Sequence, residues 1–322
     1  MTFEKIVILT PVYNDWPSFK NLLSGIDHTL HTGNPELVAT VVAIDDGSTQ
    51  REYLSESWPT FSNIQRVEIM DLARNLGHQK AIAIGLAYVK DNYSSPVVVM
   101  DCDGEDRPVD ILELLKKLQE NPEKIIFAER SRRSEGFLFI VFYALYRLLF
   151  QILTGRNISF GNFSALPWSA LKRVVYLPEI WNHFAAGVVH SGLPMSTIPS
   201  IRGKRYKGKS QMNFVKLITH GMSAISVYLD VVAIRLILFS ISVIILTVIG
   251  FVITVFIRFV TPFAIPGWAT TVALGLVVVL FQSVFFLASF SFLVLSFRSN
   301  KAFIPAKDYK DYIIDILTEY PK

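Results

Sequence analysis

The chain has 322 residues, of which 51% are hydrophobic and only 18% are charged. This composition excludes a wholly soluble protein and indicates membrane segments beside a folded domain. The formal net charge of +4 is modest, so we expect no nucleic-acid partner. Cys102 is the only cysteine, which excludes a disulfide within the chain and suits a reducing compartment.

Up to about residue 130, short apolar runs alternate with amphipathic helical patterns. The run at residues 6–9 is too short for a signal peptide, so we interpret it as a first strand. Residues 110–119 carry leucine and isoleucine at helical spacing and predict a helix. The alternation is typical of a doubly wound α/β sheet, which binds ligands beyond the carboxyl ends of its strands. The predicted strands cover residues 6–9, 39–44, 67–71, 97–100 and 125–128.

Polar loops follow the first three predicted strands. The loop at residues 10–15 contains Tyr13, whose ring can stack on a base, and the loop at residues 45–49 begins with two aspartates. The third loop, at residues 72–80, ends near His78 and Lys80, either of which can face a diphosphate. Each loop alone reads as an ordinary turn or helix cap. Because all three converge on one sheet edge, together they favour a nucleotide pocket.

The fourth predicted strand ends in a cluster of carboxylates, formed by Asp101, Asp103, Glu105 and Asp106. Acids at this density repel one another unless a divalent cation, with substrate phosphate oxygens completing its shell, is bound among them. The alternative is a solvated acidic turn between a strand and a helix.

Three arginines within residues 129–135 precede an apolar, aromatic segment at residues 137–153. A helix of this length is about 26 Å long, which is short for a membrane span, so we expect it to lie in the membrane interface. Residues 161–164 are interpreted as a loop. The histidines lack ligand spacing and do not predict a zinc site.

A basic run at residues 202–210 carries five cations and two glycines, which suits an anion or, as an alternative, anionic lipid. Residues 212–235 have one apolar and one polar stripe and predict a second interfacial helix. Two uncharged segments, residues 236–257 and 269–297, are long enough to form a transmembrane hairpin. Lysines and arginines precede the first of these segments and follow the second, so both chain termini are expected in the cytoplasm.

These motifs, in this order, resemble family 2 inverting glycosyltransferases with the GT-A fold. Among them the chain is similar to the polyprenyl-phosphate branch, which includes the dolichyl-phosphate mannose synthases and bactoprenol glucosyltransferases. The resemblance extends over nearly the whole chain. It rests on Thr10-Pro11-Val12-Tyr13-Asn14, Asp45-Asp46-Gly47-Ser48-Thr49, Asn75-Leu76-Gly77-His78-Gln79, Asp101-Cys102-Asp103 and residues 202–210, followed by two membrane spans.

For the donor, the resemblance implies a nucleotide sugar with a UDP or GDP carrier. Asp101 and Asp103 match the DxD positions, so Asp103 is expected to bind Mg²⁺ or Mn²⁺ and Asp101 to face the ribose or sugar. Glu105 stands where relatives commonly have glutamine and is expected as a further metal ligand. The expected nucleoside and donor contacts are Pro11, Tyr13, Asn14, Asp45, Asp46 and Lys80.

For the acceptor, the resemblance implies a polyprenyl phosphate. Arg130 and Arg133 match arginines that handle phosphates near the acceptor. Arg202, Arg205 and Ser210 match the basic loop before the membrane, in which Arg202 and Ser210 are expected to bind the donor and Arg205 to act in catalysis and guide the lipid phosphate. Asn162 stands where many relatives have aspartate, and Gln211 stands where lysine is common. A missing carboxylate matters less for a phosphate acceptor, which is already anionic, than for an alcohol. Asp106 is the candidate base if one is required.

The sequence therefore predicts a GT-A domain at residues 1–210, an interfacial helix at 211–233, a transmembrane hairpin at 234–298 and a cytoplasmic tail at 299–322, expected to form a small helix. The predicted activity is sugar transfer to a polyprenyl phosphate by an integral protein of a bacterial inner membrane that can form homo-oligomers. One alternative is a polysaccharide or another lipid acceptor, although the Gln-x-x-Arg-Trp motif of processive synthases is absent. The other is a membrane scaffold without catalysis.

Overall fold

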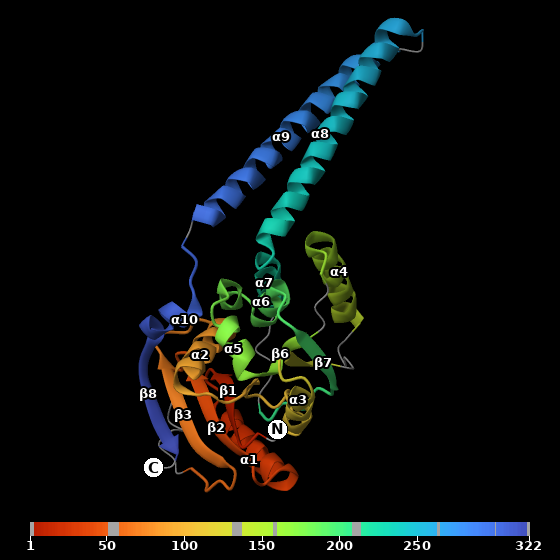
Figure 1. Ribbon diagram of the computed structural model, residues 1–322. Helices are drawn as coiled ribbons and strands as arrows, with labels where there is room; N and C mark the ends of the chain where they lie inside the picture. The colour runs from red at the N-terminus through yellow and green to blue at the C-terminus, as the bar shows by residue number, and fades with distance from the viewer. Residues whose placement is uncertain are drawn as a thin grey trace. The chain divides into compact units, whose positions relative to one another are not determined.

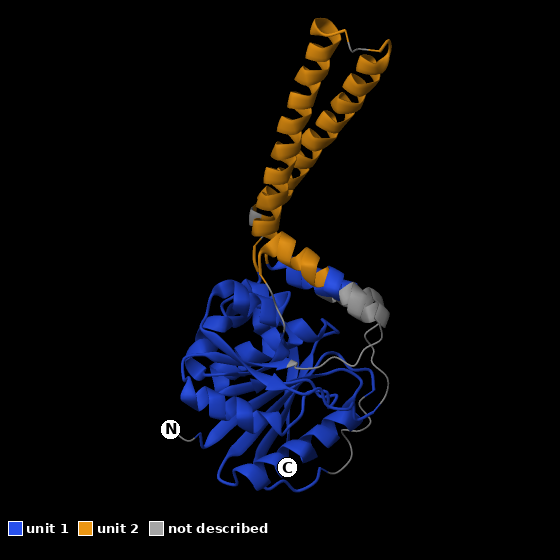
Figure 2. Ribbon diagram, turned by 90° about the vertical axis from the view of Figure 1, so that its right-hand side faces the viewer, with its two compact units in different colours: residues 1–145, 157–227, 303–322 blue, residues 146–156, 228–302 orange. Residues whose placement is uncertain are grey.

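The computed structural model describes residues 3–50, 58–130, 137–156, 160–207, 214–262, 265–299 and 301–320. The chain forms two compact units, which are coloured separately in Figure 2. We call them the sheet unit and the apolar unit. The sheet unit comprises Met1–Leu145, Asn157–Val227 and Phe303–Lys322, and the apolar unit comprises Tyr146–Arg156 and Tyr228–Ala302.

An eight-stranded mixed sheet organises the sheet unit, in the order β7-β5-β6-β4-β1-β2-β3-β8 (Figure 1). Strands β1 to β4 are parallel where they pair, whereas β6 runs antiparallel to β4 and β5, and β8 runs antiparallel to β3. The strands are β1 (Lys5–Val12), β2 (Val38–Asp45), β3 (Ile64–Leu72), β4 (Val97–Val99), β5 (Ile125–Arg130), β6 (Phe160–Leu166), β7 (Met195–Ser200) and β8 (Ile313–Tyr320).

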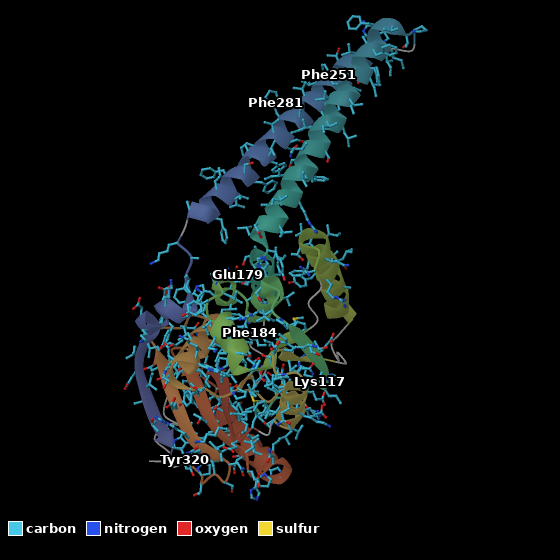
Figure 3. All side chains as sticks on the ribbon, in the orientation of Figure 1. Lys117, Glu179, Phe184, Phe251, Phe281 and Tyr320 are labelled. Carbon is cyan, nitrogen blue, oxygen red and sulfur yellow. The ribbon has the colours of Figure 1, made fainter. Side chains whose placement is uncertain are left out.

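Helices cover both faces of this sheet. Successive residues of a strand point to opposite faces, so Ile6 and Ile8 enter one core while Val7 and Leu9 enter the other. The first core contains α1 (Trp16–Gly33) and α3 (Asp110–Glu120). The second contains α2 (His78–Asn92), α5 (Trp168–Val174), α6 (Phe184–Ser191), and residues of the short helices η2 (Pro178–Trp181), α10 (Pro305–Asp308) and η3 (Tyr309–Tyr312). Phe184, labelled in Figure 3, is fully buried in that second core.

The five predicted strands are confirmed as β1 to β5, and the helix predicted at residues 110–119 is confirmed as α3. Residues 161–164, expected as a loop, instead belong to β6. This strand fills the gap between β4 and β5, so its polar backbone groups pair on both sides.

The prediction of a helical C-terminal tail is wrong. Residues 313–320 form the edge strand β8, which pairs with β3 from Ile313 opposite Leu72 to Tyr320 opposite Val67. Tyr320, labelled in Figure 3, packs edge-to-face on Phe61, with ring centroids 5.1 Å apart. The tail covers hydrogen-bonding groups that β3 otherwise exposes, which explains why it returns to the sheet unit after the apolar unit.

The apolar unit contains α8 (Leu229–Val260) and α9 (Trp268–Ser299), which lie side by side (Figures 1 and 2). Each has 32 residues, and at 1.5 Å per residue a helix of this length is about 48 Å long, enough to cross a membrane. Both qualify as candidate membrane spans by length and hydropathy. Large side chains such as Phe251 and Phe281 are exposed along them (Figure 3).

Small polar residues form the buried side of α8. Three such residues recur every seven positions and are almost fully buried: Ser240, Thr247 and Thr254. The hydroxyl of each donates a hydrogen bond to the backbone carbonyl oxygen four residues earlier. Such residues let two apolar helices approach closely. At Gly250 a Cβ would lie 3.6 Å from Leu276 of α9. The hairpin is therefore packed through its small residues.

The two segments expected in the interface are both helical. Residues 137–153 lie in α4 (Phe137–Thr154). For the second segment the sequence predicts one helix over residues 212–235, but α7 (Phe214–Ser226) ends before Tyr228, and residues 229–235 form the first two turns of α8. The amphipathic pattern therefore continues across the boundary between two helices. Hydrophobic periodicity alone does not show that boundary.

Candidate active site

The sheet topology gathers most of the predicted site residues at one edge. The carboxyl ends of β1, β2, β3, β4, β5 and β7 lie there, because all six strands run in one direction, while β6 begins at the same edge. This is the edge at which α/β sheets bind ligands. The loops after these strands therefore supply the candidate site.

Hydrogen bonds join the loops after β1 and β2. Asn14 has a left-handed backbone, with φ of 51°, and its Oδ1 accepts from the backbone N–H groups of Thr49 at 2.9 Å and Gln50 at 3.1 Å. The Asn14 N–H donates to Ser48 Oγ at 2.9 Å. Asparagine tolerates this conformation better than most residues. Asn14 therefore holds the two loops together.

The two adjacent aspartates at the end of β2 also accept hydrogen bonds from backbone N–H groups. Asp46 accepts from the N–H groups of Leu76 at 2.7 Å and Gly77 at 2.9 Å, so it ties the second loop to the third. Asp45 Oδ1 accepts from the N–H of Ser48 at 2.7 Å. Burial raises the pKa of the Asp46 carboxyl above its usual value. Both carboxylates hold the loops in place, and direct nucleoside contacts by them stay a prediction.

The other expected donor contacts differ in how accessible they are. Tyr13 is 39% exposed, as stacking on a base requires. Pro11 is instead buried within β1, opposite Ile44. The Lys80 ammonium lies over the ring of Trp181, 5.1 Å from its centroid, in a cation–π contact. Of these three, Tyr13 is best placed to meet a ligand.

A tight acidic turn follows β4, at residues 101–106. Asp106 is buried, and its Oδ2 accepts from the backbone N–H of Asp101 at 2.9 Å. Asp103 Oδ1 accepts from the N–H of Glu105 at 2.9 Å. Asp106 therefore closes the turn, an arrangement that favours a positioning role over the general-base role considered from the sequence.

Residues 202–206 of the basic run lie directly on this turn. Arg202 contacts Glu105 with two nitrogens, Nε to Oε2 at 3.0 Å and Nη2 to Oε1 at 2.8 Å, and Arg205 Nη2 contacts Asp103 Oδ2 at 2.7 Å. Charge-assisted pairs of this kind are the stronger hydrogen bonds. Two backbone bonds add to them, from Gly203 to Glu105 at 2.8 Å and from Tyr206 to Asp103 at 2.9 Å.

Two glycines make this close approach possible. Gly104 has φ of 91°, and a Cβ there would lie 2.8 Å from the Tyr206 ring. A Cβ on Gly203 would lie 2.2 Å from the Gly104 carbonyl oxygen. Both positions therefore require the absence of a side chain. The glycine between cations at 202–204 is the sequence signal that could have predicted the contact.

The acidic turn suits a divalent cation only with further ligands. Burial, reinforced by the negative charge of Asp101, raises the pKa of Asp103 to about 6. Among the described residues, no group of three or more His, Cys, Asp or Glu side chains is arranged to hold a metal ion. Mg²⁺ commonly binds one or two carboxylates and takes its remaining ligands from substrate phosphates and water. Asp103 and Glu105 fit that pattern.

A polar network that the sequence did not predict surrounds Gln79 in the first turn of α2. Its Oε1 accepts from the backbone N–H of Phe184 at 2.6 Å. Its Nε2 lies 2.8 Å from His78 Nε2 and 3.1 Å from Asn162 Oδ1. Burial lowers the pKa of His78. The network joins α2, β6 and α6 at the edge that carries the acidic turn.

The expected phosphate-binding residues are described less fully. Arg130 ends β5, opposite Ser200 of β7, so its backbone lies at the same edge of the sheet. Arg133 and Ser210 fall outside the described residues. Their predicted contacts with phosphates stay predictions.

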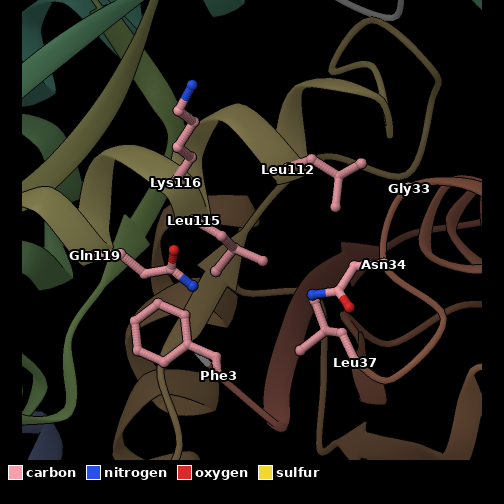
Figure 4. Close-up of a pocket in the computed structure, with 8 residues that line it drawn as sticks. All are labelled: Phe3, Gly33, Asn34, Leu37, Leu112, Leu115, Lys116 and Gln119. Carbon is pink, nitrogen blue, oxygen red and sulfur yellow. The ribbon is translucent and has the colours of Figure 1, made fainter. Parts of the chain in front are cut away.

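A separate pocket lies away from this edge, near the amino end of β1 and the carboxyl ends of α1 and α3 (Figure 4). It has a mixed lining of apolar and polar side chains and carries no carboxylate. Phe3, Gly33, Asn34, Leu37, Leu112, Leu115, Lys116 and Gln119 line it.

Comparison with known proteins adds a family and a fold. The model of the family described as "Glycosyl transferase family 2" matches residues 7–178, more than half of the chain. The chain is 29% identical over 231 residues to "Uncharacterized glycosyltransferase YkcC" of Bacillus subtilis, covering 69% of the chain and 67% of that protein. It is 26% identical over 265 residues to the "Undecaprenyl-phosphate 4-deoxy-4-formamido-L-arabinose transferase" of Edwardsiella ictaluri, covering 76% and 77%.

Among solved structures, the fold is similar to that of glucosyl-3-phosphoglycerate synthase from Mycobacterium tuberculosis. The TM-score is 0.50 at 14% identity, over 71% of this chain and 80% of that one. At this identity the likeness shows the fold alone. The mixed sheet with helices on both faces is therefore a GT-A-like domain, followed along the chain by two long apolar helices.

Proposed function

Since the chain belongs to glycosyl transferase family 2, we propose that it is a membrane-bound inverting enzyme that moves a sugar from a nucleotide-sugar donor to a polyprenyl phosphate. The observation that carries the proposal is the acidic turn at residues 101–106 with Arg202 and Arg205 on its carboxylates. Acids and guanidinium groups side by side suit a metal ion and a diphosphate bound together.

On the donor side, Asp103 and Glu105 are assigned as the ligands of Mg²⁺ or Mn²⁺. A bound divalent ion supplies positive charge to the departing nucleoside diphosphate. Arg202 and Arg205 are assigned to the diphosphate oxygens, which are the same kind of anionic partner as the carboxylates that they contact here. Tyr13 is assigned to the base, and Asn14 and Asp46 to holding the loops that surround it.

On the acceptor side, Arg130 and Arg133 are assigned to the phosphate of the lipid. A phosphate monoester is already anionic at neutral pH, so the chain has to align it with the sugar and does not have to deprotonate it. A general base is therefore not required, which is consistent with the Asp106 carboxylate accepting a hydrogen bond from the Asp101 N–H within the acidic turn. Attack on the face opposite the leaving group inverts the anomeric carbon.

Relatives and composition support this acceptor and location. The Edwardsiella ictaluri relative is named for transfer to undecaprenyl phosphate. The two candidate membrane spans suit a lipid substrate, and the lysines and arginines around them favour cytoplasmic termini in a bacterial inner membrane. The Mycobacterium tuberculosis synthase was crystallised with Mn²⁺ and UDP, so a UDP-sugar with Mn²⁺ is a suitable first probe.

The test is a transfer assay with the full-length protein in detergent. Radiolabelled UDP- and GDP-sugars are each incubated with polyprenyl phosphate and either Mg²⁺ or Mn²⁺, and lipid-linked product is extracted. We expect product from one donor, and none when EDTA replaces the metal. The protein is first shown to bind a nucleotide sugar by its stabilisation against heat. If that protein then forms no lipid-linked product with any donor, the proposed acceptor is wrong.

A further inference from the structure

Gln79 is an amide side chain, 7% exposed, that contacts three elements at the active-site edge. The backbone N–H of Phe184, the first residue of α6, points at its Oε1 across 2.6 Å. A backbone N–H can only donate, so the atom it meets must be the oxygen. This contact therefore fixes which way the Gln79 amide is turned.

The remaining end of Gln79 is an NH₂ group with two hydrogens. One can meet His78 Nε2 at 2.8 Å and the other Asn162 Oδ1 at 3.1 Å. Both partners must then accept. His78 carries its proton on Nδ1, in the neutral form that burial favours. Asn162 turns its oxygen toward Gln79, so its own NH₂ group is directed elsewhere.

The strand register locates Asn162 beside the acidic turn. Ser164 of β6 pairs with Val99 of β4, and the strands are antiparallel, so continuing the register brings position 162 opposite position 101. Asn162 is partly exposed, and its Nδ2 donates to none of the described residues. A pair of N–H donors is thus held at the edge where the sugar and its acceptor meet in the proposed function.

We propose that Gln79 is a positioning residue that fixes Asn162 as a hydrogen-bond donor, and that this donor selects an acceptor that is already anionic over a neutral alcohol. The inference deepens the proposed function and rests on it for the location of the acceptor. A carboxamide cannot remove a proton from an alcohol, but its N–H groups bind a phosphate oxygen. A carboxylate at position 162 repels the same phosphate.

The first test measures binding of the acceptor without any transfer. The full-length protein in detergent is titrated with a polyprenyl phosphate and with the polyprenol of the same length. We expect the wild type to prefer the phosphate, and Asn162→Asp and Gln79→Glu each to weaken phosphate binding at least tenfold while changing polyprenol binding less than twofold. Gln119→Glu, on α3 away from this edge, adds the same charge as a control and should change neither affinity.

Gln79→Glu is an informative variant because it can keep the hydrogen bond from the Phe184 N–H. Its carboxylate still accepts from the Phe184 N–H, so the start of α6 keeps its partner, but it can no longer donate to Asn162. Equal affinity of the wild type for phosphate and polyprenol overturns the inference. So does unchanged phosphate binding in Asn162→Asp.

The second test determines which ring nitrogen of His78 carries the proton. It uses ¹⁵N NMR of protein labelled at histidine, with His78→Gln to assign the signals. We expect His78 to be protonated on Nδ1 in the wild type and on Nε2 in Gln79→Glu, because an Nε2–H can donate a hydrogen bond to the new carboxylate. Protonation on Nε2 in the wild type contradicts the assigned orientation.

The two proposals fail in different ways. If the binding preference holds but no donor sugar is transferred, the proposed function fails and the inference stands. If sugar is transferred to the polyprenyl phosphate but both variants bind it as tightly as the wild type does, the inference fails and the proposed function stands.

Discussion

The two halves of the active-site edge are held together by different chemistry. The loops after β1, β2 and β3 are joined by side chains that bind backbone N–H groups, such as Asn14 and Asp46. The acidic turn after β4 and the basic run are joined chiefly by charged side chains, Arg202 with Glu105 and Arg205 with Asp103. The second kind of contact can be exchanged, because a metal ion can replace the guanidinium groups and a diphosphate can replace the carboxylates.

The difference predicts which carboxylates serve the fold and which serve the ligand. Asp46 is 3% exposed, whereas the side chains of Asp103 and Glu105 keep 16% of their surface. Substitution of Asp46 should therefore reduce stability, and substitution of Asp103 should reduce activity with little change in stability.

Asp103→Asn should have the largest effect on activity. Removing one carboxylate charge from the metal site should lower sugar transfer about 1,000-fold, the size of effect seen when an electrostatic stabiliser is removed. The thermal unfolding midpoint should change little, because the amide keeps an oxygen for the Glu105 N–H. Initial rates in the radiolabel assay measure this, with the exposed Glu120→Gln as control. Activity within tenfold of wild type would remove Asp103 from the metal site.

Asp46→Ala should have the largest effect on stability. It leaves the N–H groups of Leu76 and Gly77 without their acceptor, which costs about 3 kcal/mol. The thermal unfolding midpoint in detergent should fall by several degrees. Asp15→Ala is the matched control, since Asp15 makes no capping hydrogen bond at the start of α1. An unchanged midpoint together with lost nucleotide binding would instead make Asp46 a direct ligand of the nucleoside.

Arg205→Ala tests whether the basic run competes with the metal. Without Arg205, Asp103 loses a cation that neutralises it, so Mn²⁺ binding in the absence of nucleotide should strengthen about tenfold. In the presence of UDP or GDP it should weaken, because the diphosphate loses a partner. Electron paramagnetic resonance of free Mn²⁺ measures both affinities. Lys207→Ala, exposed in the same segment, should change neither. The same sign of change with and without nucleotide contradicts an exchange of partners.

The parallel strands were predictable because they are buried on both faces. Residues 39–44 and 97–100 read as continuous apolar runs, which is the pattern such strands require. The polar loops at their carboxyl ends were predictable from the same topology. Periodicity and loop chemistry, both local, were sufficient for this part of the fold and site.

Contacts between distant segments were not predictable in this way. The sequence Ile313-Ile314-Asp315-Ile316-Leu317 fits a short helix or an edge strand, and only pairing with β3 decides between them. Arg205 and Asp103 are 102 residues apart, and Gln79 and Asn162 are 83 apart. Neither pair has a spacing that a helix or hairpin imposes. The candidate site residues were therefore predicted singly, and their partners required the structure.

The smallest predicted effect comes from His78, which belongs to the half in which side chains bind backbone N–H groups. Burial lowers its pKa in the folded state below the value of 6.5 that it has when exposed. As the pH falls through 6.5, the unfolded chain therefore binds a proton that the folded chain does not. The contribution of His78 to stability is therefore full above pH 6.5, declines below it, and levels off below the folded pKa of His78.

The contribution of His78 should accordingly lower the thermal unfolding midpoint between pH 7.5 and pH 5.5, while the raised pKa of Asp103 acts in the opposite direction in the wild type and the variants alike. His78→Gln should reduce this decline, because a glutamine does not titrate. His28→Gln, exposed on α1, should retain it. An equal change in His78→Gln and the wild type would show that His78 accepts a proton without cost, and the neutral form assigned to His78 in the Gln79 network would then be wrong.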